Sequence, residues 1–171
     1  MGLNLWFGEF GADVDPEERY VSATAQKPEG VEWPEDAPLS SSLSRANSCH
    51  PSYTAWAKFT REVGLGAVVG EGSELIDSHP GAAELTGDHL RTFEGALECY
   101  SASVGATVEE AEARILASEA RRAACATSLE RLGWRYEDVP PSDWNLLRLR
   151  WLVFWTRWCL ENCKYPTFAN S

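Results

Sequence analysis

The sequence has few of the groups that usually carry catalysis or bind metals. It contains three histidines, His50, His79 and His89, and its five cysteines form no repeated CxxC pattern. The patterns typical of phosphate-binding loops, dinucleotide-binding loops, zinc proteases, serine hydrolases and zinc fingers are all absent. The sequence therefore predicts no cofactor and no metal site, and it gives little support to an enzyme.

Positive charge is also scarce. Lysine and arginine number 15 against 26 acidic residues, which gives a formal net charge of −11. Proteins bind nucleic acid and anionic membranes through basic surfaces that neutralise phosphate, so direct binding to either is not expected. An acidic chain instead suits a basic protein partner, or mimicry of nucleic acid.

Signals for export are missing as well. The amino terminus, MGLNLWFGEF, has neither a basic segment nor a long apolar run, so it does not resemble a signal peptide. An odd number of cysteines without a pairing pattern is typical of free thiols in a reducing compartment. With 171 residues, of which 44% are apolar, the chain can bury one core. We therefore expect a single cytoplasmic domain over residues 1–171.

The first third of the chain reads as a strand followed by a long loop. Residues 3–8 alternate between apolar and other side chains, a period typical of strands, and residues 19–24 are a candidate second strand. Residues 11–51 contain repeated prolines and a serine-rich run, and residues 9–36 hold nine acidic and two basic side chains. This segment is longer than ordinary connections, so we expect it to be functional or partly disordered.

Helical periodicity dominates the rest of the chain. Apolar spacing predicts helices over 53–63, from about 87, over 107–133 and over 142–163, with caps at Thr86 and Thr107. Residues 64–72 are expected to form a turn or hairpin, and residues 73–77 a short strand. The prediction is an α+β fold, in which short amino-terminal strands form a small sheet against about four helices.

The last predicted helix is rich in tryptophan. Projected at about 100° per residue, it carries an aromatic arc that includes Trp151 and Trp155, and an aliphatic arc on nearly the opposite side. Two apolar sides indicate a helix buried between neighbours, and its three arginines argue against a membrane span. The aromatic arc is interpreted as core. Its alternatives are an interface with a partner or second copy, or a ligand wall beside Arg150 and Arg157.

One polar stretch, ELIDSHPG, is a candidate site. It places Asp77 and His79 together at a predicted strand end, where binding residues tend to collect. With His50 they are the candidates for an acid–base site, while the alternative is a turn in which Asp77 caps the backbone. The residues expected to contact a ligand, if one binds, are Trp151, Trp155, Arg150, Arg157, Asp77 and His79.

Four short motifs give the chain a resemblance to small proteins encoded by bacteriophages and prophages. They are MGLNLWF at the amino terminus, YTAWAKF, SELIDSHPG and the ending WCLENCKYPTFANS. The resemblance implies an accessory protein that blocks, mimics or sequesters a component of the host cell.

These observations favour a non-enzymatic binding protein, which either sequesters a small nucleotide-like ligand, as a homo-oligomer, or blocks a host protein. A small hydrolase using Asp77, His79 and His50, and an acidic nucleic-acid mimic, are the alternatives. A pocket lined by Trp and Arg would favour the ligand, and His50 beside His79 in a cleft would favour the enzyme. A smooth acidic face would favour blocking or mimicry.

Overall fold

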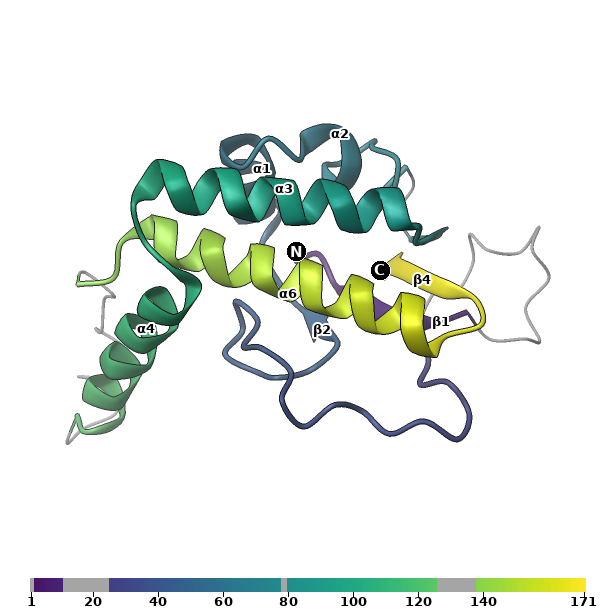
Figure 1. Cartoon of the computed structure of the whole chain (residues 1–171). Coiled ribbons are helices and arrows are strands. Elements are labelled where there is room, and N and C mark those ends of the chain that lie inside the picture. The colour runs from purple at the N-terminus through teal and green to yellow at the C-terminus, as the bar shows by residue number, and fades with distance from the viewer. Residues whose placement is uncertain (1, 11–24, 78–79, 126–137) are drawn as a thin grey trace.

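The computed structural model describes residues 2–10, 25–77, 80–125 and 138–171 (Figure 1). These residues form a four-stranded sheet with helices packed around one long helix. In chain order the elements are β1 (Leu5–Glu9), β2 (Ser48–Cys49), α1 (Tyr53–Glu62), α2 (Gly66–Val69), β3 (Gly81–Glu84), α3 (Gly87–Val104), α4 (Val108–Ala123), α6 (Pro141–Asn162) and β4 (Pro166–Asn170).

The sheet is antiparallel and has the strand order β2-β1-β4-β3. The central pair is β1 and β4, in which Phe7 lies opposite Phe168. Beyond this pair, Asn4 and Ser171 exchange two backbone hydrogen bonds of 3.0 Å. The α+β prediction is confirmed. The sheet, however, takes strands from both ends and the middle of the chain, and not only from its amino-terminal part.

Helix α6 is the centre of the packing. It lies between α3 and α4 and also packs on β1 and β4 (Figure 1). Both predicted arcs are buried, with Leu146, Leu149 and Val153 on one side and Trp151 and Trp155 on the other. Two-sided burial of the last helix is therefore confirmed. No helix in the described part of the chain is long and apolar enough to span a membrane.

Trp151 ties α6 to the sheet. Its ring meets Phe7 edge-on with 4.9 Å between centroids, and Phe7 meets Phe168 in the same way. The indole Nε1 donates a hydrogen bond of 3.0 Å to the backbone carbonyl of Ala46. This bond satisfies the one polar atom that burial of the indole would otherwise leave without a partner.

Residues 25–47, here called the strap, run without regular structure along α6 and the sheet (Figure 1). Trp33 packs against Trp155 and Trp158, with ring centroids 5.5 and 5.0 Å apart. At the start of the strap, Gln26 exchanges two backbone hydrogen bonds with the end of β1. A Cβ on Gly8 would lie 2.5 Å from the Gln26 carbonyl oxygen, so this close approach requires glycine. The strap is therefore a packed cover of the core.

The segment after α1 differs from its prediction. Helix α2 occupies part of 64–72, where a turn or hairpin was expected. Residues 73–77 do not form the predicted strand, because the N–H groups of Gly72 and Ser73 both bond to the Ile76 carbonyl and close a tight loop. The candidate strand at 19–24 lies outside the described residues.

Helices α3 and α4 begin as predicted. Thr86 and Thr107 each accept a hydrogen bond from the backbone N–H three residues on. Helix α4 nevertheless ends at Ala123, well before the predicted end at Gly133, which lies outside the described residues. Its last buried residue is Ser118, so its final turn is at most partly buried.

A buried carboxylate fixes the start of α6 against α4. Asp143 is fully buried and accepts two hydrogen bonds from Arg114, of 2.7 and 2.8 Å. It lies in the first turn of α6, where the helix dipole favours negative charge. The hydrogen bond to Asp143 in turn raises the pKa of Arg114.

The two partners of this pair should respond differently to substitution. Arg114→Met leaves a charged carboxylate buried without its partner and should lower the free energy of unfolding by about 3 kcal/mol. Asp143→Asn should cost less, because the Arg114 side chain is 40% exposed and can be solvated. Urea denaturation of both variants measures the difference, and equal losses would contradict it.

Trp151→Ala should lower the free energy of unfolding by about 3 to 5 kcal/mol, because it opens a cavity between α6 and the sheet. The control is Leu116→Ala on α4, where the side chain is 45% exposed and the expected change is within about 0.5 kcal/mol. Thermal and urea denaturation measure both values. A Trp151 variant with unchanged stability would show that this ring is not part of the core.

Candidate functional site

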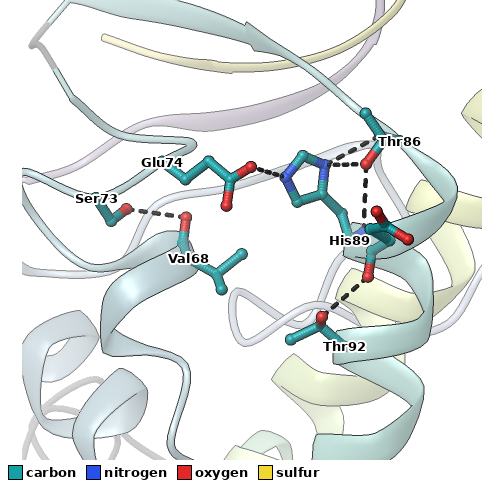
Figure 2. Close-up of polar contacts among 7 residues, drawn as sticks. Val68, Ser73, Glu74, Thr86, His89 and Thr92 are labelled. Atoms are coloured by element: carbon teal, nitrogen blue, oxygen red, sulfur yellow. Dashed lines mark hydrogen bonds and ion pairs between the residues drawn. The ribbon is translucent and has the colours of Figure 1, made fainter.

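The clearest polar cluster joins α3 to the loop after α2 (Figure 2). His89 is 5% exposed, and its Nε2 lies 3.0 Å from Oε1 of Glu74. Its Nδ1 lies 3.0 Å from the backbone nitrogen of Thr86. Because a backbone N–H can only donate, Nδ1 must accept, and the neutral ring carries its proton on Nε2 and donates it to Glu74.

This geometry makes His89 part of a helix cap. In a capping box, the third helical residue returns a hydrogen bond to the backbone of the cap residue, usually through Glu or Gln. His89 takes that position here, and its own N–H donates to Thr86 Oγ1 at 3.4 Å. Both ring nitrogens are engaged, so neither has a free lone pair to accept a proton from a substrate. The cluster is a structural clamp between a loop and a helix.

The sequence predicts Thr86 as the cap of α3 but indicates no role for His89. The signal was present, since Thr86 and His89 have the spacing of a capping box. The partner Glu74 could not be found in this way, because it comes from a loop that only the fold brings to α3. That loop is held in place by Ser73, whose hydroxyl donates to the Val68 carbonyl at 2.9 Å (Figure 2).

Of the three acid–base candidates, the structure describes two, His50 and Asp77. His50 is exposed, with Nδ1 2.8 Å from Oδ1 of Asn4 and its ring against the edge of Trp6. None of its hydrogen bonds reaches Asp77, which is exposed at the end of its loop. His79 lies outside the described residues, so its proximity to either group stays a prediction.

The tryptophans expected to contact a ligand are closed to solvent. Trp151 and Trp155 are each 1% exposed, and both belong to the largest hydrophobic cluster of the protein. A ligand can stack on either ring only if the core opens. Their ligand role stays a prediction that this packing does not favour.

The arginines beside the tryptophan arc connect α6 to its neighbours. Arg150 pairs with Glu109 and Glu112 of α4, at 3.2 and 3.7 Å. Arg157 pairs with Glu94 of α3. Ion pairs with neighbouring helices therefore explain why Arg150 and Arg157 lie along this edge of α6. Binding of a ligand by either arginine stays a prediction.

The buried thiols are not activated for nucleophilic attack. Burial raises the pKa of Cys49, and a hydrogen bond with Cys163 raises the pKa of Cys159, so both thiols stay protonated at neutral pH. Catalytic cysteines need the opposite shift. Within the described ranges, no three His, Cys, Asp or Glu side chains are grouped so that they could hold a metal ion.

A small pocket lies between the amino-terminal segment, α1 and the loop after α2. Its volume is about 110 Å³, far below the roughly 300 to 1,000 Å³ of sites for drug-sized ligands. A nucleotide-like ligand does not fit in it. The lining residues are Leu3, Tyr53, Trp56, Ala57, Glu71 and Ile76.

The acidic side chains of α4 are neutralised by arginines or by the helix itself. Glu112 pairs with Arg45 at 3.4 Å as well as with Arg150, and Glu119 pairs with Arg122 at 2.7 Å. Glu110 completes the capping box of α4, and hydrogen bonds from Thr107 lower the pKa of its carboxyl. The helix does not present a continuous acidic face.

The acidic side chains of the strap are all exposed. Glu29, Glu35 and Asp36 are exposed and form no ion pair with any residue that the structure describes. Glu32 is also exposed and pairs with Lys27 at 3.2 Å. The strap is thus an acidic surface on a packed backbone.

No protein-family profile, curated protein sequence or solved structure matches the chain. The interpretation of these surfaces therefore depends on their own geometry and chemistry.

In the clamp between Glu74 and His89, the hydrogen bond from the Thr86 N–H to His89 should contribute more to stability than the contact with Glu74. His89→Ala removes the acceptor for the Thr86 N–H and should lower the free energy of unfolding by about 1 to 2 kcal/mol. Glu74→Ala should cost about 0.5 kcal/mol or less, because the Glu74 side chain is 65% exposed. Urea denaturation tests both variants. A larger loss from Glu74→Ala than from His89→Ala would contradict the capping role.

Proposed function

We propose that the protein is a non-enzymatic binding protein that blocks a basic surface of a protein partner. The contact surface is the strap, through Glu29, Glu35 and Asp36. The observation that carries the proposal is that these three carboxylates are exposed and form no ion pair with the described residues, on a segment that is packed against the core.

The anchoring of the strap supports this function. Trp33, which lies among the acidic residues in the sequence, packs against two tryptophans of α6, and Ala37 and Leu39 are buried just after them. A segment that is already fixed loses little conformational entropy when it binds, so more of the interaction energy appears as affinity. Unpaired charges on such a segment also speed encounter with a partner of opposite charge.

The other functions receive less support from the described residues. A nucleotide sponge needs a pocket much larger than 110 Å³ or access to the tryptophan arc. The hydrolase alternative uses Asp77, His79 and His50, and the two of these that the structure describes, His50 and Asp77, are not joined by a hydrogen bond. Neither His89, whose ring nitrogens are both engaged, nor the buried cysteines supply another base or nucleophile. In the phage setting that the four sequence motifs imply, the partner would be a host protein.

Charge removal on the strap tests the proposal. The variant Glu29→Gln, Glu35→Gln, Asp36→Asn should bind a synthetic lysine-rich peptide roughly tenfold more weakly than the unchanged protein. Titration calorimetry at several salt concentrations measures this, and the salt dependence of binding should fall in the variant because fewer ion pairs form.

The matched control removes the same charge elsewhere, with Glu84→Gln, Glu98→Gln and Glu161→Gln. These residues are also exposed and form no ion pair with described residues. The control should change the affinity less than about threefold. If both triple variants lose affinity equally, only the overall charge matters and the strap is not the contact surface. A nucleotide found on the purified protein by native mass spectrometry would favour the sponge instead.

A further inference from the structure

The pocket beside α1 has walls that are fixed before any ligand arrives. Trp56 donates its indole N–H to the Val69 carbonyl at 2.7 Å and packs against Phe59 with ring centroids 5.0 Å apart. Leu3 is held by a backbone hydrogen bond of 2.9 Å to Pro51. On the opposite wall, the Ile76 carbonyl accepts two backbone hydrogen bonds that close the tight loop at 72–76.

The pocket has one charged group, the carboxylate of Glu71. This side chain is exposed and forms no ion pair with any described residue. Lys58, which follows the lining residue Ala57 in the sequence, pairs with Glu62 at 3.7 Å and not with Glu71. An unpaired carboxylate therefore stands beside a wall of aromatic and aliphatic side chains, which include Tyr53 and Trp56.

The size of the pocket limits what can enter it. At about 110 Å³ it is smaller than the 150 Å³ cavity that admits benzene, so it accepts a group of side-chain size. An anion would be repelled by Glu71. A purely apolar group would desolvate the carboxylate without replacing its hydrogen bonds to water.

An alkylammonium group matches both the apolar wall of the pocket and the carboxylate of Glu71. Its methylene carbons can contact the small parts of Leu3 and Ile76 that face the pocket, 3% and 4% of each residue. Its positive end is attracted to the half-buried ring of Tyr53 and to the exposed carboxylate of Glu71. From the combination of aromatic wall, unpaired Glu71 and small volume, we infer that this pocket binds the side chain of a lysine presented by a protein partner. Helices α1 and α2 and the strap lie on opposite sides of α6 (Figure 1), and no strap residue lines the pocket, so this site does not depend on the function proposed for the strap.

The experiment compares a charged probe with a neutral one. N-acetyl-lysine methylamide and N-acetyl-norleucine methylamide are titrated into the protein, and the NMR signal of the Trp56 indole N–H reports binding in the pocket. The lysine compound should bind at least about fivefold more tightly than the norleucine compound. Equal binding of the two, or no shift of the Trp56 signal with either, overturns the inference.

Three variants test whether Glu71 is responsible for the preference for lysine. Glu71→Gln should abolish the preference for lysine, while Glu98→Gln, which removes an exposed and unpaired carboxylate on α3, should leave it unchanged. Both substitutions are at exposed positions, and an unchanged spectrum outside the pocket confirms the fold. The strap variant Glu29→Gln, Glu35→Gln, Asp36→Asn should keep full lysine binding at Trp56. An unchanged preference in Glu71→Gln, or its loss in Glu98→Gln or in the strap variant, overturns the assignment.

Discussion

Helix α6 is apolar on two opposite sides, and both sides must be shielded from water. The other elements of the fold pack against one side or the other. On the aromatic side, Trp151 meets Phe7 of the sheet and Trp155 meets Trp33 of the strap. On the aliphatic side, Leu146 belongs to a second cluster with Ile115 of α4. A helix with a single apolar stripe would need one covering layer. Two stripes require the sheet, the strap, α3 and α4 to meet at one helix.

Elements with a long, regular pattern were predictable from the sequence. The helices over α1, α3 and α6 and the first strand follow from apolar spacing and capping residues alone, because these signals are local. Strand β4 was not predictable, since its five residues include Pro166 and Asn170, which are both disfavoured in strands. It forms because β1 and β3 offer backbone partners on both of its edges.

Which carboxylates are paired with arginine or lysine was the property hardest to predict from the sequence. Residue counts give the net charge of −11, but they do not say which carboxylates are already paired. Helix α4 and the strap both carry several carboxylates in the sequence. Arg45 of the strap and Arg150 of α6 pair with the carboxylates of α4 only once the chain has folded. The same reasoning applies to Glu74 and His89, which are joined across a loop.

The pairing of β1 with β4 has a consequence for the order of folding. These strands lie near opposite ends of the 171-residue sequence, and every contact between them closes a loop that contains nearly the whole chain. Closing such a loop is slow compared with forming local helical contacts. During synthesis, α1, α3 and α4 emerge from the ribosome with their apolar faces uncovered, because α6 and β4 have not yet been made. The nascent chain is therefore exposed to aggregation until α6 and β4 have been made.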